Sequence, residues 1–196
     1  MEVRVANVRL DSTVFAGEQD FWAEAARQLE ELQAKGVQLA LFPGLTGLLH
    51  GAIGLNAGRR LQDWLPHLAS RHPLFERGFA ELASKYRLYL CPGTSIIEEK
   101  NRYYLTASLF DPQGRKLGEQ RQTHLSRQER SQGFARGEEL PVWATELGTV
   151  GIVAGTDIWY PEVSRILALQ GAELVLAPAA VPGPYNPWLQ VAGMWQ

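Results

Sequence analysis

The stretch VGIVAGTDIWYPEVSRILALQGAELVLAPAA, residues 150–180, decides the fold. It opens with a short apolar run that predicts a buried strand, and this run ends at Gly155. Pro161 follows where the first turn of a helix accepts proline, and Gly171 is well suited to end that helix. A second apolar run lies at 174–177. The order predicts a βαβ unit, and such folds usually place their chemistry at the corner between the first strand and the helix.

The rest of the chain shows the same alternation of strands and helices. The periodicity predicts strands near 3–8, 37–42, 88–91, 102–110, 116–122 and 140–146, helices from an Asp20 cap to Gly36 and over 73–85, and a Gly-rich loop over 45–60. Asp111-Pro112-Gln113-Gly114 predicts the turn of a β-hairpin, and Glu98-Glu99-Lys100 the solvated tip of another. Together these elements indicate an α/β layered fold with helices covering a mixed sheet.

Composition limits the classes of protein to consider. The 196 residues fit one domain over 1–196, with 45% hydrophobic and 20% charged residues. A formal charge of -2 supplies neither a basic field for nucleic acid nor a polybasic patch for a membrane. No apolar run has the length of a membrane-spanning helix, and the first residues do not resemble a signal peptide. The single Cys91 excludes an internal disulfide, so we expect a cytoplasmic protein.

The end of the chain predicts an incomplete domain. Asn186-Pro187 resembles an N-cap followed by the first helical residue, yet the sequence stops at Gln196. A helix that begins so close to the terminus suggests that the native product continues further.

Three segments together resemble the nitrilase, or carbon–nitrogen hydrolase, superfamily. They are LALFPG at 39–44, FDPQGRKLGEQRQTHLSRQE at 110–129 and VGIVAGTDIWYPEVSR at 150–165, in order and with fitting separations. The resemblance implies a four-layer αββα sandwich that dimerises or builds larger spirals through helices near the active site. It also implies cleavage of nitriles or amides by a Cys nucleophile, a Glu base and a Lys that stabilises the tetrahedral intermediate, with no cofactor.

The residues that match the family's catalytic positions cannot perform this chemistry. The Glu position falls on Gly44, the Lys position on Gln122 and the Cys position on Gly155, while a second Glu found in many members matches Glu129. A thioester route needs a sulfur, and loss of one member of such a triad usually costs roughly 10⁴- to 10⁶-fold in rate. The resemblance therefore indicates a retained fold without the reaction.

Residues around the corner have alternative interpretations. Asp157 and Arg165 are expected to form a shielded pair, with Pro161 and Glu162 starting the helix. Candidate pocket residues are Glu129, Thr156, Trp159 and Tyr160, although the two aromatic residues suit a dimer surface equally well. Cys91 or Thr156 as a displaced nucleophile is the alternative to a structural role. The histidines show no metal-ligand spacing, so no metal site is predicted.

Three functional hypotheses follow. The first is an inactive family member that acts as an oligomerising scaffold or protein partner through helix 161–170 and the C-terminal segment. The second is a binder or sensor for amide- or carboxylate-type small molecules, in a pocket enlarged by Gly44 and Gly155, with Gln122 offering hydrogen bonds. The third is a residual or altered amide hydrolase.

Overall fold

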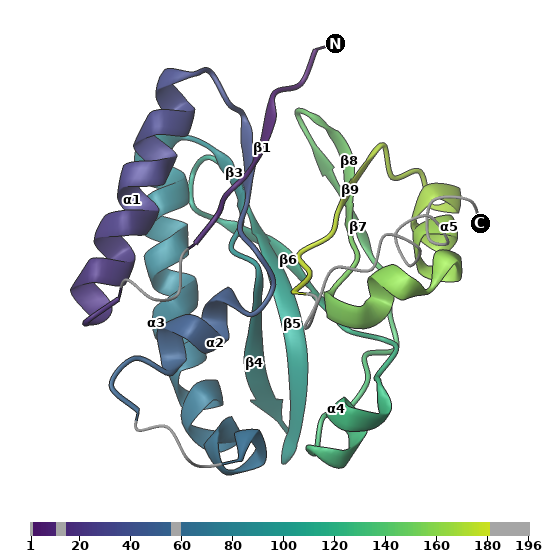
Figure 1. Ribbon diagram of the computed structural model, residues 1–196. Helices are drawn as coiled ribbons and strands as arrows, with labels where there is room; N and C mark the ends of the chain where they lie inside the picture. Colours follow the sequence, from purple (N-terminus) through teal and green to yellow (C-terminus); the bar gives the residue numbers. More distant parts are fainter. Residues whose placement is uncertain (1, 11–14, 56–59, 181–196) are drawn as a thin grey trace.

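The computed structural model describes residues 2–10, 15–55 and 60–180, and its elements follow the predicted alternation (Figure 1). The expected helix after Asn186 lies outside these residues. In chain order the elements are β1 (Val5–Asn7), α1 (Glu18–Ala34), β2 (Leu39–Leu41), α2 (Thr46–Gly51), α3 (Leu61–Tyr86), β3 (Tyr89–Cys91), β4 (Thr94–Glu99), β5 (Arg102–Phe110), β6 (Lys116–Arg121), α4 (Arg127–Ser131), β7 (Val142–Thr145), β8 (Gly148–Ile152), the 3₁₀ turn η1 (Gly155–Trp159), α5 (Pro161–Leu169) and β9 (Leu174–Leu176).

Among the described residues the strands form two sheets. The larger has six strands in the order β1-β2-β3-β5-β4, with β6 also paired to β5; the smaller has the order β7-β8-β9. β1, β2 and β3 are parallel, whereas β5 runs antiparallel to β3, β4 and β6, so the larger sheet is mixed as predicted. The predicted hairpin at 111–114 joins β5 to β6.

The two sheets and their helices make four layers. Buried side chains of α1 and α3, among them Phe21 and Phe79, pack on one face of the larger sheet. A second apolar cluster, including Leu109 and Ile152, lies between the two sheets. Val163 and Leu167 of α5 bury the outer face of the smaller sheet. Figure 1 shows this succession from left to right, and it confirms the αββα sandwich.

The βαβ unit predicted over 150–180 is present. β8 and β9 pair in parallel, with Val150 opposite Leu174, and α5 begins at Pro161. Gly171 follows the end of α5 with φ +92°, a left-handed conformation that glycine adopts at little cost. Gly36 ends α1 in the same way, with φ +70°.

Several predicted boundaries were wrong. The Gly-rich segment contains α2, whose buried residues include Thr46 and His50. α3 begins at Leu61 rather than Pro73, because its apolar face packs well enough to keep Pro66 and Pro73 inside one helix. The cap of α1 is Gly17 rather than Asp20, which lies in its first turn. β4 was missed as a strand, although its tip at residues 98–100 was expected.

Candidate functional site

The corner after β8 is filled by a neighbouring side chain. Gly155 has φ +58°, and its backbone N–H donates to the carbonyl oxygen of Pro178 at 3.3 Å. A Cβ atom at this position would overlap Oε1 of Gln122 and would lie 2.9 Å from Cδ2 of Leu105. The space that a nucleophile at residue 155 would need is therefore taken up by the Gln122 side chain.

Gln122 is itself fixed by hydrogen bonds. It is buried, and its Nε2 donates to the carbonyl oxygen of His124 (2.9 Å) and to Oγ1 of Thr156 (2.7 Å). Its Oε1 accepts from the backbone N–H of Thr156 at 3.4 Å. Both amide hydrogens and the oxygen thus serve the protein itself, so Gln122 does not offer its amide to a ligand, contrary to the second hypothesis.

The corner after β2 is closed by backbone. A Cβ atom on Gly44 would lie 2.6 Å from the carbonyl carbon of Ala179 and 2.7 Å from the backbone nitrogen of Ala180. Gly44 also donates its N–H to the carbonyl oxygen of Ala179 at 3.2 Å. The segment 178–180 therefore joins both corners, and the expectation that the two glycines leave enlarged space was wrong.

Asp157 has partners other than the predicted Arg165. Its buried carboxylate accepts from the backbone N–H groups of Thr123 (2.8 Å) and His124 (2.6 Å), and from the Thr123 hydroxyl at 3.1 Å. Burial raises the pKa of Asp157, although these hydrogen bonds and the neighbouring His124 oppose the rise. Arg165 is exposed on α5, so the predicted ion pair is wrong. Asp157 instead fixes the loop after β6 against the corner.

The aromatic residue after η1 helps to hold the same loop. The ring of His124 stacks on Tyr160, with centroids 4.0 Å apart, and its Nε2 lies 3.9 Å from Oε1 of Glu162. Trp159 is 38% exposed. Neither Trp159 nor Tyr160 lines the pocket described next, so of the four candidate pocket residues only Glu129 and Thr156 do.

A pocket of about 400 Å³ lies beside the closed corner. Its walls come from α2, α3, β4, β5, α4 and η1, and from the segments next to α2, α4 and β9. Most of the lining is apolar: Leu45, Leu48, Leu61, Ile96, Leu105, Leu125, Phe134 and Ala180, with Thr94, Ser126, Gln128, Glu129, Gln132, Gly155 and Thr156 as the remainder. Its volume is within the usual range for small-molecule sites, roughly 300–1,000 Å³.

Cys91 is not a displaced nucleophile. Its side chain is fully buried between the sheets, and burial raises the pKa of its thiol to about 12. Because the thiolate is the reactive form, this cysteine behaves as a small core residue.

A serine, a histidine and a glutamate lie in a line outside the pocket, an arrangement that the sequence analysis missed. Nδ1 of His72 is 2.8 Å from Oγ of Ser95, and its Nε2 is 3.5 Å from Oε2 of Glu76. Ser95 is only 5% exposed and packs against Gly47, so no substrate reaches it. Glu76 also accepts from Ser108 and pairs with Lys116. The group fastens α3 to the sheet.

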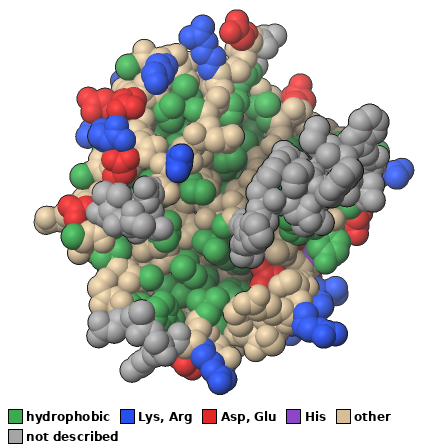
Figure 2. Space-filling model, viewed as in Figure 1, with side chains coloured by type: hydrophobic (Ala, Val, Ile, Leu, Met, Phe, Trp, Pro, Cys, Tyr) green, Lys and Arg blue, Asp and Glu red, His purple; other side chains and the backbone are tan. Residues whose placement is uncertain are grey.

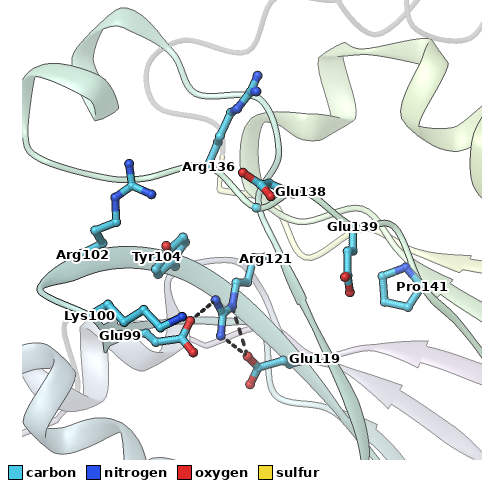
Figure 3. A pocket seen from close by; sticks show the side chains of 11 residues that line it. Glu99, Lys100, Arg102, Tyr104, Glu119, Arg121, Arg136, Glu138, Glu139 and Pro141 are labelled. Carbon is cyan, nitrogen blue, oxygen red and sulfur yellow. Dashed lines mark hydrogen bonds and ion pairs between the residues drawn. The ribbon is translucent and has the colours of Figure 1, made fainter.

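A second, charged groove of about 570 Å³ lies along β5, β6 and the segment 136–141 (Figure 3). Arg121 lies between Glu99 and Glu119 there, with N–O distances of 2.5 and 3.2 Å, and its guanidinium carbon is 4.6 Å from the Tyr104 ring centroid. These contacts tie β4 and β5 to β6. The other charged side chains of the groove are exposed, as on an ordinary solvated surface.

Comparison with known proteins identifies the family. A model of the family described as carbon-nitrogen hydrolase matches residues 4–195. This chain belongs to the carbon-nitrogen hydrolase family. A bifunctional nitrilase/nitrile hydratase of Nicotiana tabacum is 30% identical over 189 residues, which cover 89% of this chain and 53% of that protein. A probable nitrilase of Schizosaccharomyces pombe is 32% identical over 150 residues, 76% of this chain and 52% of its own length.

Solved structures show the same carbon-nitrogen hydrolase fold. A carbon-nitrogen hydrolase from Helicobacter pylori superposes with a TM-score of 0.77 at 20% identity, covering 96% of this chain and 64% of that one. An amidase from Nesterenkonia sp. gives a TM-score of 0.76 at 22% identity, covering 92% and 66%. The chain thus spans about half the length of the curated relatives named above.

Within residues 2–10, 15–55 and 60–180, no helix combines the length and apolar character required to cross a membrane. The same residues contain no group of three or more His, Cys, Asp or Glu side chains placed to hold a metal ion.

Proposed function

We propose that this chain is a catalytically inactive carbon-nitrogen hydrolase family member that acts by associating with protein, in the first place with a second copy of itself. The observation that carries the proposal is what occupies the two corners, the one after β2 at Gly44 and the one after β8 at Gly155. Gly44, Gln122 and Gly155 supply no base, cation or nucleophile, and the space at both glycines is occupied by Gln122 and by the backbone of residues 179–180.

Other groups near the corner do not replace the missing chemistry. Oγ1 of Thr156 accepts from Gln122 and lies 2.9 Å from the carbonyl oxygen of His124 and 3.2 Å from Oε2 of Glu129. Glu129 could take its proton, but none of the described residues that line the pocket is a cation that could stabilise an oxyanion. A hydroxyl nucleophile needs both contributions, and this geometry supports inactivity over a residual hydrolase.

An activity assay tests the first half of the proposal. We expect no release of ammonia from aliphatic or aromatic nitriles and amides above the rate in buffer, for the native sequence and equally for Thr156→Val and Cys91→Ala. The comparison of the native sequence with Thr156→Val decides whether any turnover depends on the Thr156 hydroxyl. Turnover by the native sequence that disappears in Thr156→Val would identify an altered hydrolase and would overturn the proposal.

The outer side of α5 supports association. Leu169 is 78% exposed and Ile166 is 40% exposed, three residues apart on one side of the helix, and Ile158 and Trp159 are also exposed just before it. Exposed apolar side chains grouped in this way are typical of contact surfaces. Glu162 and Arg165 lie on the same helix and would provide a polar rim. If two copies of the chain met about a two-fold axis at this side of α5, these exposed apolar side chains would be buried against the same side chains of the second copy.

Self-association is the second expected result. In sedimentation velocity we expect a concentration-dependent dimer, and Leu169→Asp should raise the dissociation constant at least about tenfold, because it places a charge in an apolar contact. Ser164→Asp, on another side of α5, is the matched control and should leave the dimer intact. A monomer at all concentrations, or equal effects of both variants, would contradict association through α5.

A further inference from the structure

The described residues that line the pocket beside the corner carry one charge. Figure 2 shows hydrophobic side chains gathered on the lower middle of this face, over the region between α2 and α4. Of the described residues that line the pocket, Glu129 alone is ionisable, and eight of the others are aliphatic or aromatic, as given above. A single carboxylate in a mainly apolar recess gives the recess a net negative charge, which favours a cation and disfavours an anion.

The Glu129 side chain is held in place by the local fold. Glu129 and Ser126 form a capping box at the start of α4: the Ser126 N–H donates to Oε2 of Glu129 at 2.7 Å, and Oγ of Ser126 accepts from the Glu129 N–H at 3.1 Å. Oε2 is also 3.2 Å from Oγ1 of Thr156. Oε1 has no hydrogen-bond or ion-pair partner among the described residues. Hydrogen bonds to Oε2 therefore fix the orientation of the Glu129 carboxylate, and Oε1 is available to a ligand.

The corner offers a ligand no donor in return. Both hydrogens of the Gln122 amide are used by His124 and Thr156, and the N–H groups of Gly44 and Gly155 donate to Ala179 and Pro178. A ligand carbonyl or carboxylate would thus find no donor at Gln122, Gly44 or Gly155, where its burial without a partner is costly, and could pair only with the neutral side chains elsewhere in the lining. A ligand that donates hydrogen bonds and carries a positive charge would satisfy Oε1.

We propose that this pocket binds small organic ammonium compounds, with the apolar body among Leu48, Ile96 and Leu105 and the ammonium group on Glu129. The ligand is bound and released unchanged. This differs from the amide or carboxylate ligand expected from the sequence, because the Gln122 amide expected to bind it is already paired and the Glu129 carboxylate repels an anion. The proposal does not depend on dimer formation, and it rests on the proposed inactivity only in that no bond is broken.

Calorimetric titration with matched probes tests the proposal. Benzylamine at neutral pH should bind saturably with a dissociation constant of roughly 1 mM or below, a strength consistent with a compact ligand of this size. Benzyl alcohol, which keeps the ring but lacks the charge, and phenylacetate, which carries the opposite charge, should bind at least about tenfold more weakly.

Two variants locate the binding. Glu129→Gln keeps a side chain that can complete the capping box but removes the charge, so benzylamine affinity should fall at least about tenfold. Glu138→Gln, in the charged groove of Figure 3, is the matched control and should bind benzylamine as the native sequence does. The melting temperature of each variant without ligand reports whether the fold is retained.

Three results would overturn the ammonium pocket. They are equal binding of benzylamine and benzyl alcohol by the native sequence, undiminished binding by folded Glu129→Gln, and no saturable benzylamine binding at all. The first comparison uses only the native sequence, so it holds even if a variant fails to fold. Because benzylamine contains no amide or nitrile, these outcomes are independent of the turnover assay, and hydrolysis of an amide would count against inactivity alone.

Discussion

Gly44→Ala should lower the free energy of unfolding by about 3 kcal/mol, within the upper range for overpacking a close-packed site. The added methyl would lie 2.6 to 2.9 Å from three backbone atoms of Ala179 and Ala180. These backbone atoms cannot relieve the overlap by a change of rotamer, as a flexible side chain can. Their segment is held at both ends, by the N–H of Gly44 to Ala179 and by the N–H of Gly155 to Pro178, so relief of the overlap would break contacts at both corners.

Urea unfolding followed by circular dichroism measures this effect. Gly17→Ala is the matched control, because nothing lies within 4 Å of a Cβ atom at Gly17 and its φ of -159° is open to alanine. Gly17 caps α1, so this control should cost within about 1 kcal/mol. Gly44→Glu, which places the family's residue at the position, should destabilise more than Gly44→Ala. If Gly44→Ala were as stable as the native sequence, the segment 178–180 would not close this corner.

The sequence predicts the supports of the corner well because these follow local rules. Short apolar runs indicate β8 and β9. Pro161 begins α5 and Gly171 ends it, each through a backbone preference that a single residue carries. The same local rule misplaced the start of α3, since Pro73 suits a first turn equally well. Packing of Phe75 and Phe79 against α1 and the sheet outweighs that preference.

The contents of the corner are harder to predict, because they depend on residues that meet only in three dimensions. The motif alignment shows that Gly155 lacks a thiol, but not that Gln122 lies over it, 33 positions earlier in the chain. Asp157 has an obvious cation in Arg165 within the same helix unit, yet it bonds the backbone of Thr123 and His124. A partial signal was present: the resemblance already placed residues 122, 129 and 155 at one site.

The contact between Gly155 and Gln122 gives the second large effect. Gly155→Ala should lower the free energy of unfolding by about 3 kcal/mol from two sources. A residue other than glycine at positive φ costs about 1–2 kcal/mol, and the methyl also overlaps Oε1 of a Gln122 side chain that three hydrogen bonds hold in place. Gly171→Ala separates the backbone cost from the overlap, because Gly171 also has a positive φ, +92°, but nothing lies within 4 Å of a Cβ atom there. It should show the backbone cost alone.

A double-mutant cycle then isolates the overlap. Gln122→Ala should itself destabilise, by about 2 kcal/mol, because it removes buried hydrogen bonds, but it also vacates the space that the new methyl needs. In that background Gly155→Ala should cost about the backbone term and a small shift of the Leu105 side chain, whose Cδ2 lies 2.9 Å from the new methyl. The difference gives a coupling of at least about 1 kcal/mol between residues 122 and 155, which are in contact. Additive costs would mean that Gln122 does not occupy the nucleophile position.

The same logic applies to restoring the thiol: Gly155→Cys should stay inactive with Gln122 in place, since the sulfur would compete for space with the amide and gain neither a base nor a cation.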